Sequence, residues 1–383
     1  MSKYYRDYQG VSLSDSAFWN NLFGFIVTGG ALAVFFQANY NSGCGDFPQH
    51  FQVVRNGAII GAIIGLLFNL FHSKIPNAYR VQPLLIFLLR MYLGWIIMGY
   101  GMAKVFAGQF PMLMANMDAR FVELTPMRVA WAFFGYSKGY QMFLGWGEVI
   151  PAVLILFRRT TLLGTILMVT VMLNVWLVNI FFDVCVKLNS FTYMIVGVYI
   201  LLQYTNRLWK FFFTNQAVPA AYYPDLADKK VFQRIGLTIN IILVSFILYF
   251  PLVTFYDYFV TPEVPKYKSL LYGAWKIQKI EKWDGNNWVI PAPTDSCNFN
   301  RSFFEGSTGV LQSDLKRQRF GYSVDSAKKE LTLDFINDRN TRYEKQVWQF
   351  AKPDLDNISL IGRWGKDSIR TEWLLRKETL LRK

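Results

Sequence analysis

The sequence contains few of the residues on which metal and redox sites depend. Its 383 residues include three cysteines, Cys44, Cys185 and Cys297, and two histidines. No two cysteines form a C-x-x-C pair, which excludes a thioredoxin-like motif and a zinc ribbon. The low histidine count argues against a multi-histidine metal centre and against a haem-rich protein. We therefore expect no metal site.

Charged residues are also scarce. They make up 17% of the chain, against about a quarter in soluble proteins, whereas hydrophobic residues make up 53%. The formal net charge is +14, but the basic residues are scattered and form no known nucleic-acid-binding motif, so we expect no nucleic-acid partner. Residues 1–260 are apolar blocks with short polar gaps, and residues 262–383 are polar and basic. We interpret this shift in composition as the main domain boundary.

The N-terminal part contains apolar runs that are long enough to cross a bilayer. Seven of them approach the about 20 residues that a transmembrane helix requires. They are residues 17–36, 56–73, 83–106, 128–157, 160–182, 190–205 and 235–258. In the fourth run, the stretch from Trp131 to Tyr140 contains Ser, Lys and two glycines. We interpret that stretch as a broken or re-entrant piece.

Basic residues set the expected orientation of these spans, because Lys and Arg are enriched in cytoplasmic loops. The loops after spans 2, 4 and 6 contain Lys74, Arg80, Arg158, Arg159, Arg207, Lys210, Lys229, Lys230 and Arg234. With these loops and the N-terminus in the cytoplasm, the odd span count places residues 262–383 in the periplasm of a bacterial inner-membrane protein. The cysteines then face an oxidising space, where either a Cys44–Cys185 disulfide or three unpaired thiols is compatible with the sequence.

Polar side chains within or beside the apolar runs form the candidate functional site. Each costs free energy in lipid, so we expect it to face the bundle interior or a water-filled cavity. Arg90 and Lys104 are 14 residues apart, which places them on similar faces of a helix, about 21 Å apart. Glu148 needs a partner, for which Arg90 is the candidate. The predicted pocket, open to the outer side, contains Arg90, Tyr100, Lys104, Tyr140, Gln141, Glu148, Asn179, Asp183 and Lys187.

Two interpretations of these residues are open. They form either a functional pocket or a polar clamp that holds the helices in register. Asp183 and Lys187 are spaced to pair on one helical turn. We interpret Arg158 and Arg159 as determinants of topology. Close helix packing is the expected role of Gly94, Gly99, Gly101, Gly135, Gly139, Gly145, Gly147 and Gly164.

Residues 272–377 alternate between apolar and polar side chains, which predicts about eight short strands. Leu331, Leu333 and Phe335 alternate with polar residues, and the stretch Asp284-Gly285-Asn286-Asn287 is a hairpin turn signal. An antiparallel meander that closes as a barrel fits this pattern. A barrel of this size is either packed solid or holds one small ligand. The expected core, rather than a ligand site, contains Trp275, Trp348 and Trp373.

Two stretches of the β domain resemble a known family. Tyr272-Gly-Ala-Trp275 resembles the Gly-x-Trp start of lipocalin-like domains, and Arg370-Thr-Glu-Trp373 would close the barrel against that tryptophan. We therefore expect a helical membrane bundle followed by a lipocalin-like β domain. The expected parts are a transmembrane hairpin (1–82), a four-helix core (83–212), a cytoplasmic loop with the last span (213–260) and the β domain (262–383).

The stretch from Arg90 to about Lys210 resembles the DoxX-like membrane proteins. The resemblance rests on the helix Arg90…Gly94…Gly99…Lys104, on Gly145-Trp-Gly-Glu148 and on Leu-Phe-Arg-Arg-Thr-Thr…Gly164. The run Phe-Asp183-Val-Cys-Val-Lys187-Leu is similar to the FDxPVKL run of one subgroup, with Cys185 in place of proline. DoxX relatives include a subunit linked to thiosulfate:quinone oxidoreduction, redox proteins of methylamine systems and cargo or assembly factors.

The resemblance implies an accessory or assembly protein that binds a membrane-protein partner or a lipophilic ligand. Two other functions remain open. One is a membrane redox protein or subunit with quinone as a cofactor in the pocket. The other is a carboxylase-like or lipid-modifying enzyme in which Lys104 or Lys187 acts as base.

Overall fold

The structure, a computed structural model, describes residues 15–38, 46–214, 217, 230–259, 270–313, 316–336, 342–352, 354 and 356–376. Cys44 lies outside these residues, so the alternatives for the cysteines stay predictions. The chain divides into two compact units. The helical unit contains Met1–Gln109 and Ser137–Thr261, and the barrel unit contains Phe110–Tyr136 and Pro262–Lys383.

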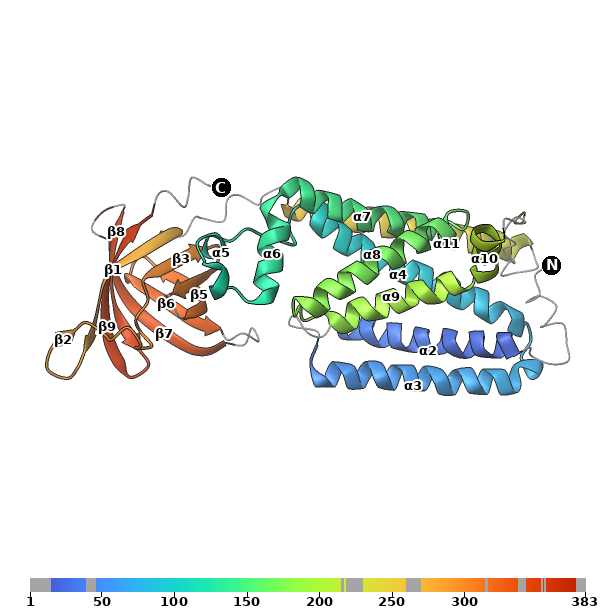
Figure 1. The fold of residues 1–383 in the computed structure, drawn as a ribbon, viewed down its shortest axis with the longest axis horizontal. Coiled ribbons are helices and arrows are strands. Elements are labelled where there is room, and N and C mark those ends of the chain that lie inside the picture. The colour runs from blue at the N-terminus through green and yellow to red at the C-terminus, as the bar shows by residue number, and fades with distance from the viewer. Residues whose placement is uncertain are drawn as a thin grey trace. The chain divides into compact units, whose positions relative to one another are not determined.

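The helical unit is a bundle of long apolar helices that run nearly parallel to one another (Figure 1). The long helices are α2 (Asp15–Ala38), α3 (Pro48–Phe71), α4 (Val81–Val105), α7 (Lys138–Leu156), α8 (Thr161–Phe181), α9 (Lys187–Leu202) and α11 (Lys230–Phe259). Shorter helical elements are η1 (His72–Lys74), η2 (Ala78–Arg80) and α10 (Thr205–Phe213). At one end of this bundle Asp46, two residues before α3, contacts Lys187 at the start of α9.

Glycines bring the first two helices of the bundle into backbone contact. A Cβ on Gly29 would collide with the carbonyl of Gly57, and one on Gly61 would collide with the carbonyl of Phe25. Helix α4 is the central element, since it packs against α2, α7, α9 and α11. Its buried side chains, such as Leu93 and Ile97, form the middle of the hydrophobic core.

Six helices of the described chain are long and apolar enough to cross a membrane, which shows a membrane-associated protein. They contain residues 17–37, 48–74, 78–105, 138–156, 161–181 and 233–256. The remaining apolar helix, α9, has 16 residues and is about 24 Å long, less than the about 30 Å of a bilayer core. The predicted span 190–205, which corresponds to α9, therefore stays a prediction.

The β domain is a closed antiparallel barrel. Its strands are β1 (Gly273–Trp283), β2 (Trp288–Val289), β3 (Arg301–Glu305), β4 (Thr308–Gln312), β5 (Arg317–Asp325), β6 (Glu330–Ile336), β7 (Arg342–Ala351), β8 (Asn357–Trp364) and β9 (Asp367–Leu375). Each strand from β3 to β9 pairs with the next, β1 pairs with β3, and β9 closes the ring by pairing with β1. The two-residue β2 only extends the β1 hairpin, so eight strands form the wall, as the sequence predicts.

Apolar side chains at alternate positions of the strands point inward and fill the barrel interior. Leu331, Leu333 and Phe335 are buried, and Trp275, Trp348 and Trp373 lie in the same core. The predicted turn is present: the backbone N–H groups of Asn286 and Asn287 both donate to Asp284. The stretch that contains Trp373 closes the barrel on β1, as predicted, but Trp373 pairs with Ile277, and the partner of Trp275 is Leu375.

The segment between α4 and α7, residues 110–136, is here called the connecting segment. It contains α5 (Met114–Met117), η3 (Phe121–Glu123) and α6 (Pro126–Tyr136), and it belongs to the barrel unit (Figure 1). The predicted fourth span, residues 128–157, is therefore wrong in its first part, and residues 110–136 do not belong to the helical core. Helix α7 begins after Ser137, whose extended backbone breaks the helix and whose side chain accepts from the Tyr140 N–H.

Candidate functional site

Helices α4 and α7 lie unusually close together where the predicted polar residues occur. A Cβ added to Gly101 would lie 3.0 Å from the Gly145 carbonyl oxygen, and one added to Gly145 would lie 2.6 Å from the Val105 nitrogen. Gly99 and Gly147 have nothing within 4 Å of such a Cβ. Only some of the predicted packing glycines therefore bring backbones together, and the pair Gly101–Gly145 fixes the spacing of the two helices.

Lys104 and Glu148 form a buried ion pair between these helices. The Lys104 ammonium donates to both carboxylate oxygens of Glu148, at 2.9 and 2.7 Å. The two side chains are only 8% and 3% exposed, so each charge has lost its water and depends on the other. The Lys104 Nζ also lies 5.9 Å from the centroid of the Tyr100 ring.

Arg90 has a different role from the one predicted. Its Nε and Nη2 donate to the carbonyl oxygens of Ile155 and Leu156, each at 2.8 Å. These carbonyls end helix α7, where the helix dipole is negative and no intrahelical donor remains. Arg90 thus caps α7, and the prediction that it pairs with Glu148 is wrong, because Lys104 reaches back along α4 to that carboxylate.

Three tyrosines that the sequence did not single out as a group lie beside the ion pair. Tyr193 of α9 contacts both Tyr92 and Tyr100 of α4, with ring centroids 6.2 Å apart in each pair. The predicted pocket did not include Tyr92 and Tyr193. The sequence could have indicated them, because a tyrosine hydroxyl within an apolar run is a polar group. Tyr100 is 38% exposed, so this aromatic row reaches the surface of the bundle.

The other predicted residues of α7 divide between its two faces. Gln141 is almost fully buried and lies two helical turns before Glu148, on the same face. Tyr140 is largely exposed and stacks on Phe143. Gln141 therefore lies on the face of α7 that carries Glu148, and Tyr140 lies on a more exposed face.

Asn179, Asp183 and Lys187 make a separate group around the α8–α9 turn. Asn179 donates to the Ser190 hydroxyl at 2.9 Å, and Lys187 pairs with Asp183 at 2.7 Å. The sequence missed Asp46, which accepts from the backbone N–H groups of Lys187 and Leu188 and so caps α9. These contacts tie the α2–α3 loop to the α8–α9 turn rather than opening a pocket.

Amide side chains that the sequence did not select hold other helices together. Gln203 exchanges hydrogen bonds with Asn20 at 3.0 and 2.9 Å and accepts from Gln82 at 2.9 Å. Asn21 donates to Asn69 at 3.0 Å. Because such pairs satisfy each other inside the bundle, they join α2 to α3, α4 and α9 without leaving a polar cavity.

A second polar cluster lies in the barrel unit, where the connecting segment packs on the outer wall. Met114 and Ala115 are buried against Ala274, Phe303 and Val310 of β1, β3 and β4. The Met114 N–H donates to Glu305 at 2.7 Å. The apolar contacts of Met114 and Ala115 therefore hold α5 against the three neighbouring strands β1, β3 and β4.

Ion pairs surround that contact. Asp118 accepts from Arg301 at 3.1 Å and from Arg376 at 2.8 Å, and Glu123 accepts from Arg301 at 3.4 Å. The Gln312 side-chain amide also donates to Glu123. Burial alone would raise the pKa of Glu123, but the hydrogen bonds from Arg120 and Gln312 and the charge of Arg301 lower it below its usual value.

Arg317 completes this interface at its basic side. Its Nη2 donates to the Asn116 side chain at 2.6 Å, and Arg128 reaches the same oxygen at 3.4 Å. Burial, with the nearby charges of Arg128 and Arg319, lowers the pKa of Arg317 to about 9. The connecting segment is therefore held by a charged network that no local sequence pattern indicated.

The barrel interior contains a few polar atoms among its aromatic side chains. The indole N–H of Trp275 donates to Leu271, and that of Trp348 donates to Gln346 and Arg363. Within the described residues, the Trp373 Nε1, Thr371 Oγ1 and Ser302 Oγ atoms have no hydrogen-bond partner.

Comparison with known proteins gives one informative result. No family model matches the chain, and no solved structure matches it. The chain is 35% identical over 129 residues to the uncharacterized protein YwoB of Bacillus subtilis (strain 168), and the match covers 34% of this chain and 82% of that relative. This chain belongs to the YwoB family. The YwoB relationship covers about a third of the chain, and the printed name gives no activity to carry over.

In this member of the YwoB family, the buried charged side chains of α4 and α7 are bonded to other groups of the bundle. The Lys104 ammonium is bonded to Glu148, and the Arg90 guanidinium is bonded to the end of α7. No group of three or more His, Cys, Asp or Glu among the described residues is placed to hold a metal ion. Lys104, Glu148 and Arg90 thus hold helices α4 and α7 together.

Proposed function

We propose that this chain is a DoxX-like accessory protein of the bacterial inner membrane that holds a β-barrel interaction module at the membrane surface. The observation that carries this proposal is the packing of the connecting segment on the barrel wall. Both ends of that segment continue into membrane helices, α4 and α7. The chain therefore joins the barrel unit to the helical unit at three points, which are the two ends of the connecting segment and the N-terminal connection of the barrel.

Chain connectivity supports the proposed topology independently of the loop charges. The connecting segment precedes α7, and the barrel on which it packs follows α11. The start of α7 and the end of α11 then lie on one side of the membrane, which requires an even number of crossings between them. Helices α7, α8 and α11 supply three of these crossings, so this count supports α9 as the fourth despite its length.

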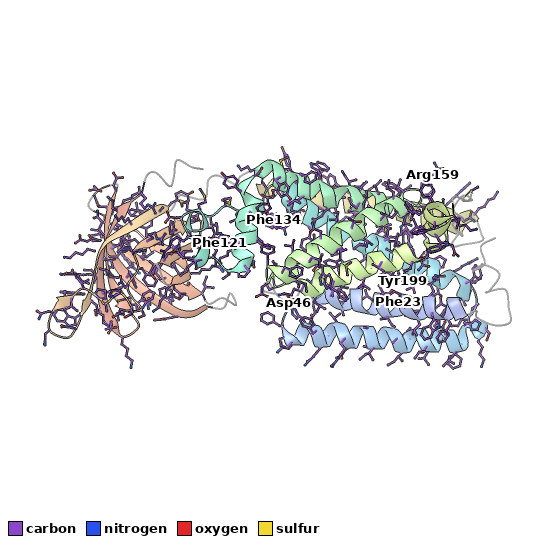
Figure 2. All side chains as sticks on the ribbon, in the orientation of Figure 1. Phe23, Asp46, Phe121, Phe134, Arg159 and Tyr199 are labelled. Carbon is purple, nitrogen blue, oxygen red and sulfur yellow. The ribbon has the colours of Figure 1, made fainter. Side chains whose placement is uncertain are left out.

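The charges of the loops support the side on which the barrel lies. Asp46 and Arg159 are at opposite ends of the helical unit (Figure 2), and Arg159 belongs to the basic end with Lys74 and Arg207. Basic loops face the cytoplasm. The proposed location of the barrel is therefore the periplasm, on the side of Asp46.

A partner protein is the expected occupant of the barrel module. Wild-type protein, extracted from its own membranes in mild detergent, is expected to retain a stoichiometric partner chain that mass spectrometry detects. The variant Asp118→Arg, which repels Arg301 and Arg376, is expected to lose it. The charge swap Asp118→Arg with Arg301→Asp is expected to restore it, and Glu372→Gln on the exposed face of β9 serves as the control. A partner retained equally by all variants would contradict the proposal.

Quinone binding is a second candidate, favoured by one observation. The row formed by Tyr92, Tyr193 and Tyr100 reaches the bundle surface beside the Lys104 ammonium, where a lipid-soluble ring could stack and accept a hydrogen bond. Quinone that co-purifies with the wild type and not with Tyr100→Leu would favour this function. A lipid-modifying enzyme with Lys104 as base has less support, because the Lys104 side chain is engaged by both carboxylate oxygens of Glu148.

A further inference from the structure

A groove lies at the basic end of the helical unit, between α8 and α10. It has a volume of about 350 Å³ and is lined by Arg159, Arg207, Leu163, Ile166, Phe211 and Phe212, among others. Figure 2 places Arg159 at the end of the bundle, where Figure 1 shows α10. The groove therefore combines two guanidinium groups with an apolar wall.

Among the residues that the structure describes, no acidic side chain pairs with the basic groups of this groove. Neither Arg159 nor Arg207 has an ion pair within the described residues. Between residues 157 and 214 the single acidic residue is Asp183, which pairs with Lys187 at the α8–α9 turn. Two guanidinium groups on one groove are a recognition site for a phosphate, since each presents a planar set of N–H donors.

Helix α10 has the composition of a helix that lies in the membrane interface. None of its residues is buried within the unit, and Trp209, Phe211 and Phe213 are all more than half exposed. The rings of Trp209 and Phe213 are in contact, tilted by 31° with centroids 4.5 Å apart. Exposed aromatic residues beside Arg and Lys are typical of helices at the level of lipid headgroups.

We propose that this groove binds an anionic phospholipid, with its phosphate between Arg159 and Arg207 and an acyl chain along Leu163, Ile166 and Phe211. Basic grooves between membrane helices on the cytoplasmic side suit such headgroups. A choline headgroup is disfavoured, because its positive charge would meet two guanidinium groups. The site is independent of the proposed role of the barrel.

The test uses the full-length protein in mild detergent and native mass spectrometry with dioleoyl-phosphatidylglycerol or dioleoyl-phosphatidylcholine. We expect retained phosphatidylglycerol to exceed phosphatidylcholine in the wild type. Each of Arg159→Gln and Arg207→Gln is expected to weaken phosphatidylglycerol binding about fivefold, and the double variant about 25-fold. The matched control is Arg158→Gln, which removes a neighbouring exposed arginine that does not line the groove and is expected to change nothing.

Three outcomes would overturn the proposal. One is equal retention of the two lipids by the wild type. Another is a loss in Arg158→Gln as large as that in the other variants, which would indicate a diffuse charge effect. The third is displacement of phosphatidylglycerol by inorganic phosphate alone, which would leave the apolar wall without a role. If the double variant does not fold, the loss of phosphatidylglycerol binding in each single variant tests the proposal by itself.

Discussion

Arg301 on strand β3 and Asp118 in the connecting segment are 183 positions apart in the chain, yet they form an ion pair at 3.1 Å. Arg376, which follows β9, binds the other oxygen of the same carboxylate at 2.8 Å. Asp118 thus joins the connecting segment to β3 and to the residues that follow β9.

Removing this carboxylate should loosen the connecting segment. The variant Asp118→Asn is expected to destabilise the barrel unit by about 1–3 kcal/mol, because two partly buried guanidinium groups lose a charged acceptor. Hydrogen exchange should rise in α5 and η3, and the thermal unfolding temperature should fall. The variant Glu372→Gln, at an exposed position of the same unit, should leave both unchanged. Unaltered exchange in Asp118→Asn would contradict this role.

Glycine substitutions should separate packing positions from open ones on α4. The variant Gly101→Ala is expected to cost about 1–3 kcal/mol, because its Cβ would meet the Gly145 carbonyl and Val149. The variant Gly99→Ala, two residues earlier, has open space and should be neutral or slightly stabilising. Thermal unfolding in one detergent measures both. Equal losses would show that the α4–α7 contact does not set the stability of the bundle.

The buried ion pair should behave as a structural clamp. The variant Glu148→Leu leaves the Lys104 ammonium buried without its carboxylate and is expected to cost about 3–5 kcal/mol. The double variant Lys104→Met with Glu148→Leu removes both charges and should recover most of that loss, as measured by unfolding in detergent. The double variant should also retain the partner protein. A stable double variant that loses a measurable activity or bound quinone would instead assign a functional role to the pair.

Acid should weaken the barrel unit through Glu123. Its pKa in the folded protein lies below the usual value of 4.5, so its contribution to stability is fully present above about pH 4.5. That contribution is lost as the pH falls through the lower folded pKa. Urea unfolding, followed by the fluorescence of the core tryptophans, should therefore show a falling midpoint below pH 4.5. In Glu123→Gln the midpoint should be lower at neutral pH and should depend less on pH in this range.

Local patterns predicted the barrel well, since the alternation around Leu331 and the turn at Asp284 depend on neighbours in sequence. Apolar runs similarly predicted most of the membrane helices. The partner of Glu148 was predicted incorrectly, because spacing along α4 cannot reveal which side chain reaches back toward α7. The connecting segment was also misassigned: Trp131 and Phe134 look like part of a span, and only its contacts with β3 and β4 place it in the barrel unit.

The connecting segment also orders the events of biogenesis. Residues 110–136 are synthesised well before Arg301, Arg317 and Arg376. Asp118 therefore cannot form its ion pairs with both Arg301 and Arg376 until the last strand of the barrel has been translated. Closure of the barrel between β1 and β9, and of the contact between Asp118 and Arg376, therefore has to follow synthesis of the end of the barrel unit.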